Sequence, residues 1–155
     1  MQNAILGFFG NYRFLSNFFE VPGGYLTETI LRNSGQFQTI YYPTLEHAYQ
    51  ASKTTCGETH YSISVSYKDP KTVKFIGRSL PMRNDWDLVK DAVMFYWVQK
   101  KFTHPTLAQW LIDTYPLQLI EANYWGDYYW GCDYSLYGEN RLGEILMDVR
   151  DGLLG

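Results

Sequence analysis

The sequence contains only two cysteines and three histidines, scattered along the chain. Cys56 and Cys132 are too few for the disulfide framework of small secreted proteins, so a reducing, cytoplasmic location is the default. His47, His60 and His104 show no His-Glu-x-x-His spacing, and two isolated cysteines cannot complete a zinc cage. We therefore expect no metal site and no bound cofactor.

Long apolar runs are also missing. No stretch approaches the ~20 apolar residues that a membrane-spanning helix requires. The first residues have no basic start, and the apolar run from Ile5 to Phe9 is short and is broken by Gly7. We therefore expect neither a secretion signal nor a membrane anchor. The net charge of -3 argues against indiscriminate coating of nucleic acid, but it leaves room for a small basic pocket around one nucleotide.

Aromatic residues, in contrast, are abundant: the chain has 14 Tyr, 9 Phe and 5 Trp. Phenylalanine is explained by core packing, whereas tyrosine and tryptophan carry polar groups that need partners when buried. This composition favours a pocket for a planar, hydrogen-bonding ligand. A tyrosine-rich surface that contacts another protein would give a similar composition.

The 155 residues suit one domain over residues 1–155, and we find no linker or repeat. β-branched and aromatic residues predict a small N-terminal antiparallel sheet from strands near residues 5–9, 25–29 and 38–42. Helical patterns follow at residues 44–55, 70–76, 85–102, 105–114 and 142–153, and we interpret the ambiguous segment 56–67 as helical. Residues 85–102 are apolar on more than one side, so we expect this helix to be central. The predicted fold class is mainly α (α+β).

Glu46 is the first candidate catalytic residue. It lies in a predicted helix that begins at Thr44, with Gln50 and Lys53 on the same side at offsets of four and seven residues. Glu46 and Lys53 are then roughly 10 Å apart along the helix axis, and both can point into one cavity. The alternative is a polar stripe that faces solvent.

Asp127 is the second candidate acid. It opens the aromatic turn Asp127-Tyr128-Tyr129-Trp130-Gly131, where a ring could stack on Tyr129 or Trp130 while the acid faces the bond being broken. The alternative is an ordinary turn or cap residue.

Two further features have a functional and a structural interpretation. The spacing Gly138-x-Asn140-x-x-Gly143 before a helix could present backbone N–H groups to a phosphate, or could be an ordinary turn that leads into the helix. Trp86 could wall a pocket or could simply pack in the core.

This set of residues suits cleavage of a bond between the anomeric carbon of a sugar and a base nitrogen. The transition state of this reaction resembles an oxocarbenium ion. A nearby carboxylate, such as Asp127 or Glu46, stabilises this positive charge and can activate the attacking water. Lys53 could alternatively attack the opened sugar as an amine and form a Schiff base.

The same residues lie in motifs that resemble the NADAR family, also called YbiA-like, over nearly the whole chain. The matching motifs are Leu15-Ser16-Asn17-Phe18, Tyr42-Pro43-Thr44-x-Glu46-His47-x-x-Gln50-x-x-Lys53, Arg83-x-Asp85-Trp86, Asp127-x-x-Trp130-Gly131 and Gly138-x-Asn140-x-x-Gly143. Their order and spacing together are specific, although each motif alone is weak. Residues 25–38 and 61–67 depart from the family pattern, which puts the choice of substrate in doubt.

The resemblance implies a mostly helical fold and N-glycosidase activity. It implies catalytic roles for Glu46, Lys53 and Asp127, and substrate binding by Arg13, Asn17, Trp86, Tyr129, Trp130, Gly138 and Asn140. Two substrate classes are associated with the family: ADP-ribose on guanine in nucleic acid, in some cases as an antidote to a DarT-type toxin, and a phosphorylated ribosylamino-pyrimidine intermediate of riboflavin synthesis. We favour the first, because many tyrosines suit stacking on an exposed base. A non-catalytic reader of NAD or ADP-ribose and an aromatic interaction module are the alternatives.

Overall fold

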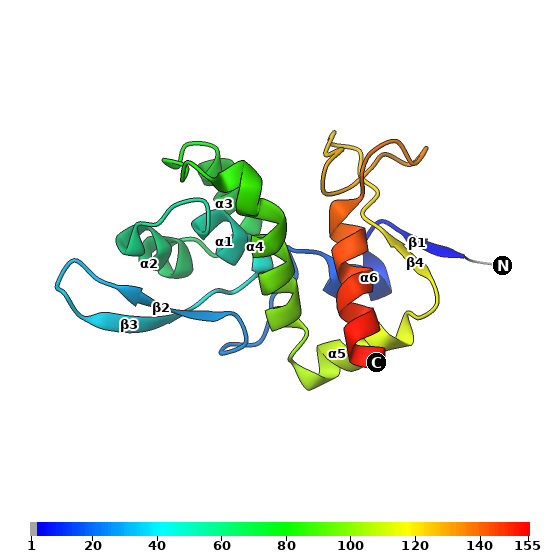
Figure 1. Cartoon of the computed structure of the whole chain (residues 1–155), viewed down its shortest axis with the longest axis horizontal. Coiled ribbons are helices and arrows are strands. Elements are labelled where there is room, and N and C mark those ends of the chain that lie inside the picture. The colour runs from blue at the N-terminus through cyan, green and yellow to red at the C-terminus, as the bar shows by residue number, and fades with distance from the viewer. Residues whose placement is uncertain (1–2) are drawn as a thin grey trace. The chain divides into compact units, whose positions relative to one another are not determined.

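The computed structural model describes residues 3–155, which form two compact units (Figure 1). The central unit comprises Asn17–Lys101. The terminal unit comprises the described part of Met1–Ser16 together with Phe102–Gly155. In sequence, the central unit is thus inserted between the two parts of the terminal unit.

An antiparallel hairpin lies at the start of the central unit. Strand β2 (Thr27–Leu31) pairs with β3 (Phe37–Tyr41), and Thr27 lies opposite Tyr41. The turn between the strands contains Gly35 at φ +86°, a backbone conformation that glycine adopts readily. Helix α2 contacts both strands and lies beside the hairpin in Figure 1.

The helices of the central unit are α1 (Leu45–Ala51), α2 (Gly57–Ser66), α3 (Pro70–Gly77) and α4 (Trp86–Lys101). Every residue of α1 is buried, and α1 contacts each of the other three helices. A short helix in this position is held by its neighbours rather than by its own helix propensity. The polar side chains of α1 are therefore fixed inside the unit.

Side chains cap three of the helix starts, and the cap at Thr44 confirms the predicted start there. The Thr44 hydroxyl accepts a hydrogen bond from the backbone N–H of His47, and the Asp69 carboxylate accepts one from that of Lys71. His104 caps α5 (Pro105–Asp113) through its Nδ1 atom. Such local hydrogen bonds satisfy N–H groups that have no partner within the helix.

Helix α4 is buried on one side only, so the expectation of an enclosed helix is wrong. Trp86, Met94 and Trp97 are buried, and the Trp97 indole N–H donates to the Ser52 hydroxyl over 2.9 Å. On another side, Leu88 is 87% exposed. The apolar residues are too widely spread around α4 to be covered by the neighbouring helices.

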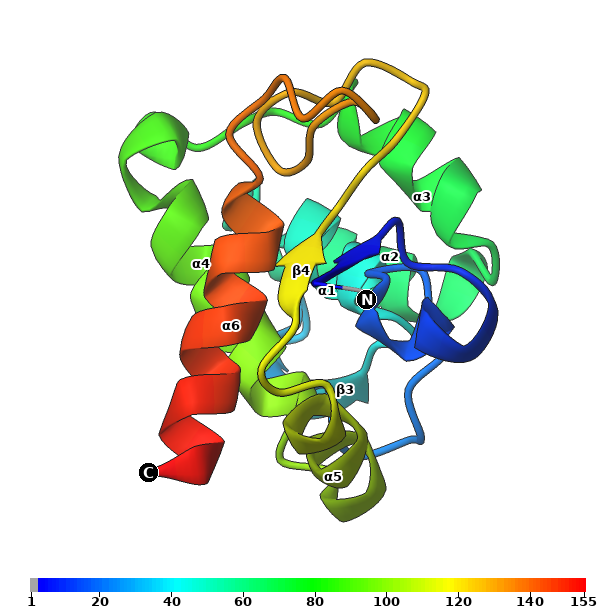
Figure 2. The ribbon, with the colours of Figure 1, turned by 90° about the vertical axis from the view of Figure 1, so that its right-hand side faces the viewer.

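The terminal unit combines a pair of parallel strands with helices. β1 (Ala4–Leu6) pairs with β4 (Gln118–Ile120), and α6 (Arg141–Leu154) packs against β4 and α5, as Figure 2 shows. A 3-10 helix, η1 (Gly10–Leu15), follows β1. The segment around Ile5 therefore joins a parallel pair with a strand that lies far away in sequence.

This pairing corrects the predicted three-stranded antiparallel sheet. Only the second and third predicted strands pair with each other, as β2 and β3. The first predicted strand, residues 5–9, overlaps β1, whose partner is β4. Alternation of apolar residues indicates a strand but does not identify its partner.

The fold class is confirmed as mainly helical with a small β component, and residues 56–67 are largely helical as α2. That residues 1–155 form one domain stays a prediction. Across residues 3–155, no helix combines the length and the apolar character needed to cross a membrane.

Candidate active site

The predicted residues of the central unit gather around α1. Glu46 is only 6% exposed, and its Oε1 atom accepts a hydrogen bond of 2.7 Å from Gln50 Nε2. Its backbone N–H donates to the carbonyl oxygen of Asn17 over 3.0 Å. The burial of Glu46 and Gln50 excludes the alternative of a polar stripe that faces solvent. Asn17, a predicted binding residue, thus lies next to the first turn of α1.

Gln50 is fixed against α3 by a very close contact. Its Nε2 atom must face Glu46, because a carboxylate can only accept, and the amide oxygen therefore points the other way. A Cβ atom added to Gly77 of α3 would lie 1.8 Å from this oxygen. The oxygen is buried and has no hydrogen-bond partner within residues 3–155. Sequence reasoning did not identify Gly77, because only the packing of α3 on α1 shows its role.

Lys53 lies two turns beyond Glu46 and is half-buried. Its ammonium lies 5.8 Å from the centre of the Tyr49 ring. Burial lowers the pKa of Lys53, the nearby charges of Lys74 and Arg78 lower it further, and the charge of Glu46 opposes them. Lys53 and Glu46 therefore lie close enough to interact electrostatically, as the helical spacing predicts.

Trp86 is buried at the start of α4. Its ring packs against Tyr49 with centroids 5.2 Å apart and planes tilted by 57°. These contacts agree with the interpretation as core packing. The role of Trp86 as the wall of a binding pocket stays a prediction.

The predicted residues of the terminal unit gather in the loop between β4 and α6. Asp127 Oδ1 accepts hydrogen bonds from the backbone N–H groups of Tyr129, over 3.1 Å, and Trp130, over 2.9 Å. Oδ1 therefore stabilises the turn, as expected if Asp127 is an ordinary turn residue. Both of these hydrogen bonds involve Oδ1, and the catalytic role of Asp127 stays a prediction.

Asn123 holds this loop in shape, although the sequence analysis did not single it out. Its buried side chain donates to the backbone oxygen of Asp127 over 2.9 Å and accepts from the N–H of Asp127 over 3.1 Å. An asparagine four residues before an aspartate, with Gly126 between them, is the local signal that could have found it.

The side chain of Asn140 has a structural role, and the binding roles of Gly138 and Asn140 stay predictions. Asn140 Oδ1 accepts from the N–H of Glu121 and its Nδ2 donates to the oxygen of Leu119, both in or next to β4. The backbone N–H groups of residues 139–142 all donate to carbonyl oxygens of residues 128–131. Since these donors are occupied, they are not available to a phosphate, and the turn is an ordinary one that leads into α6.

The remaining predicted residues of the terminal unit lie at its surface. Tyr129 and Trp130 are half-buried, and their rings meet edge to face at 4.9 Å. Arg13 is exposed on η1. The binding roles of these three residues stay predictions.

Comparison with known proteins identifies the family. The NADAR domain matches residues 8–154. The chain belongs to the NADAR family. It is 37% identical over 119 residues to the N-glycosidase Npun_R5314 of Nostoc punctiforme, covering 74% of this chain and 76% of that protein. It is 32% identical over 159 residues to the N-glycosidase YbiA of Escherichia coli, covering 99% and 91%.

The NMR structure of Escherichia coli YbiA matches this NADAR chain with a TM-score of 0.73, 31% identity and coverage of 99% of this chain and 87% of that one. A maize protein named riboflavin biosynthesis protein PYRR is 32% identical over 126 residues, which cover 74% of this chain but only 20% of that protein. The prediction of an enzyme that acts on N-glycosyl bonds is confirmed.

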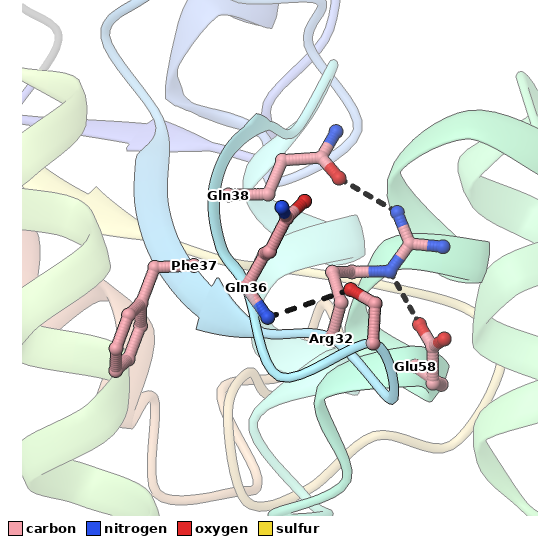
Figure 3. A pocket seen from close by; sticks show the side chains of 6 residues that line it. Arg32, Gln36, Phe37, Gln38 and Glu58 are labelled. Carbon is pink, nitrogen blue, oxygen red and sulfur yellow. Dashed lines mark hydrogen bonds and ion pairs between the residues drawn. The ribbon is translucent and has the colours of Figure 1, made fainter.

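A surface hollow of the central unit lies at the tip of the hairpin, lined by residues of the hairpin and by Glu58. It measures about 400 Å³ and is shown in Figure 3. Arg32 lies at its centre, where it donates to Glu58 and to Gln38 over 2.6 Å each and stacks over the Tyr61 ring. Because the guanidinium is already occupied and no predicted site residue lines the hollow, we do not place the chemistry there.

Proposed function

We propose that this NADAR protein hydrolyses the C–N bond between ribose and a nucleobase-like ring, and that its substrate is ADP-ribose attached to guanine in nucleic acid. The observation that carries this proposal is the buried Glu46 carboxylate, oriented by Gln50 and accompanied by the half-buried Lys53. A buried acid with a fixed hydrogen bond and a nearby cation is an arrangement typical of catalytic sites.

The proposed reaction uses one water molecule. Glu46 takes a proton from the water while the oxygen of that water attacks the anomeric carbon of the ribose. The C–N bond breaks, its electron pair stays on the base nitrogen, and the departing base takes up a proton from solvent. Glu46 then releases the proton that it took from the water and is ionised again. Positive charge develops on the sugar at the transition state, and the Glu46 carboxylate stabilises it. The catalytic role of Asp127 stays a prediction. Lys53 holds a phosphate of the substrate by its charge.

Exposed tyrosines in the loop of Asp127 support the nucleic-acid substrate. Tyr124 and Tyr134 stack with ring centroids 4.5 Å apart and planes at 21°, and Tyr124 is 86% exposed. Tyr128 and Tyr137 form a second, edge-to-face pair. Exposed rings of this kind bind unpaired bases by stacking.

A phosphorylated ribosylamino-pyrimidine intermediate of riboflavin synthesis is the second candidate substrate. It is favoured by the similarity to the plant proteins whose names refer to riboflavin biosynthesis. It is also favoured by the acidic loop, since Asp127, Asp133 and Glu139 would repel the backbone of a long polyanion. Both candidates share the bond that is cleaved. The cytoplasmic location and the toxin context stay predictions.

The test is turnover of both substrates, an oligonucleotide with one ADP-ribosylated guanine and the riboflavin intermediate, followed by chromatography and mass spectrometry. The parent protein should release the base from one of them, and Glu46→Gln should slow this release by about 100-fold or more. The glutamine keeps the size and hydrogen-bonding ability of the side chain but cannot accept the proton. Equal rates for parent and variant would remove Glu46 from the mechanism, and no turnover of either substrate would contradict the proposed function.

A further inference from the structure

Two cations of the central unit, Lys74 and Arg78, lie close enough to Lys53 to interact with it electrostatically. Lys74 and Arg78 lie four residues apart across the end of α3, and side chains at this spacing share one side of a helix. α3 packs on α1 at Gly77, where the absence of a side chain allows the contact with Gln50. This packing brings Lys74 and Arg78 toward Lys53, which lies just after the end of α1.

The charges of these residues act on one another. The pKa of Lys53 is lowered by burial and by the charges of both Lys74 and Arg78, and the charge of Glu46 only partly offsets these effects. Three cations around one acid leave an excess of positive charge. Like charges at short range repel, and an anion bound among them removes this repulsion.

An aromatic ring lies under each cation. The Lys53 ammonium is 5.8 Å from the Tyr49 ring centre, that of Lys74 is 5.9 Å from Phe18, and the Arg78 guanidinium is 5.9 Å from Phe75. A ring attracts a cation and restricts its movement, but it carries no net charge. These contacts therefore position the three side chains without neutralising them.

We propose that Lys53, Lys74 and Arg78 together bind a phosphate group of the substrate and so hold the ribose for attack beside Glu46. This inference rests on the proposed function for the identity of the substrate. Arginine offers a planar pair of donors that matches two phosphate oxygens, and the lysines contribute point charges. The pyrophosphate of ADP-ribose and the monophosphate of a ribose 5-phosphate share this chemistry.

The experiment measures the Kd of three ligands by isothermal titration calorimetry: ADP-ribose, ribose 5-phosphate and adenosine, which has no phosphate. The variants are Lys74→Met and Arg78→Met, which keep much of the apolar stem and remove the charge. Lys100→Met is the matched control. The Lys100 ammonium also lies 5.9 Å from a ring centre, that of Tyr96, but Lys100 is in the last turn of α4 and is not one of the three proposed residues. Circular dichroism and melting temperature verify that each variant is folded.

We expect each of Lys74→Met and Arg78→Met to weaken ADP-ribose or ribose 5-phosphate binding by about tenfold or more, and to leave adenosine binding unchanged. The preferred phosphorylated ligand identifies the source of the phosphate. Parental Kd values in both variants, an equal effect of Lys100→Met, or no binding of either phosphorylated ligand by the parent would overturn the proposal. If the parent binds ADP-ribose through these residues but cleaves no N-glycoside, the proposed function fails and the phosphate site stands.

Discussion

The two units of this NADAR protein differ in charge and in the way they present their acids. The central unit has ten Lys and Arg residues against eight Asp and Glu, whereas the terminal unit has three against eight. In the central unit, Glu46 is buried within a packed helix and lies near cations. In the terminal unit, Asp127 lies in a loop among exposed aromatic rings. The two units therefore carry different chemistry: a buried acid with cations near it in the central unit, and a half-buried acid among exposed rings in the terminal unit.

Among the variants that test this difference between the units, we expect the largest effect for Asp127→Asn. The asparagine Oδ1 atom can accept the same hydrogen bonds from residues 129 and 130, so the turn and the melting temperature should stay unchanged. Loss of the negative charge should lower kcat by about 100-fold, because the oxocarbenium-like transition state loses a stabilising charge. Parental kcat, measured with the substrate that the protein turns over, would show that Asp127 only shapes the loop.

A smaller effect is expected from Asn123→Ala, which loosens the loop without changing its charge. The buried amide bridges the backbone of Asp127, and its removal leaves backbone groups without partners. We expect a loss of about 3 kcal/mol in the free energy of unfolding, measured by urea denaturation. Asp133→Ala is the control, since that carboxylate forms a similar turn but is itself not buried. An equally small loss for both variants would contradict the role of Asn123.

Gly77→Ala tests the packing of the central unit. The added methyl group would clash with the Gln50 side chain, so we expect a loss of about 2 kcal/mol in stability and weaker orientation of Glu46. Gly152→Ala in α6 is the matched control, because a Cβ atom there meets no neighbour. The interpretation would be wrong if both substitutions changed the free energy of unfolding by the same amount.

The smallest effect concerns pH and the contact between Glu28 of β2 and His60 of α2. Burial is the largest influence on both pKa values and favours the neutral forms. The hydrogen bonds and opposite charges outweigh it, so the pKa of His60 lies above 6.5 and that of Glu28 below 4.5. The His60 contribution to stability is fully present below pH 6.5 and is lost as the pH rises through the higher folded pKa. The Glu28 contribution is present above pH 4.5 and is lost as the pH falls.

The Glu28–His60 pair should therefore stabilise the central unit most between pH 4.5 and pH 6.5. The melting temperature of the parent should exceed that of His60→Gln by the largest margin near about pH 5.5, and the margin should shrink toward about pH 9. A margin that does not vary with pH would contradict a charged pair.

Features that depend on neighbouring residues could be predicted from the sequence. The cap at Thr44 and the position of Glu46 and Gln50 on one helix follow from hydrogen bonds and spacings within a few residues, although α1 ends before Lys53. These are set by the local chain, and the packing of other elements does not change them.

Features that depend on tertiary packing could not be predicted. The partner of β1 lies more than a hundred residues away, and strand alternation carries no information about it. Asn140 matched a motif that suits phosphate binding, yet its side chain is used by the backbone beside β4. Lys74 and Arg78 gained significance only because α3 packs on α1.

The most direct test of the account is a crystal structure of the Glu46→Gln variant with ADP-ribosylated guanosine bound. We predict that the side chain at position 46 lies within about 5 Å of the anomeric carbon, with the phosphate on Lys53, Lys74 and Arg78. An anomeric carbon remote from position 46, or a phosphate that contacts none of these three cations, would contradict it.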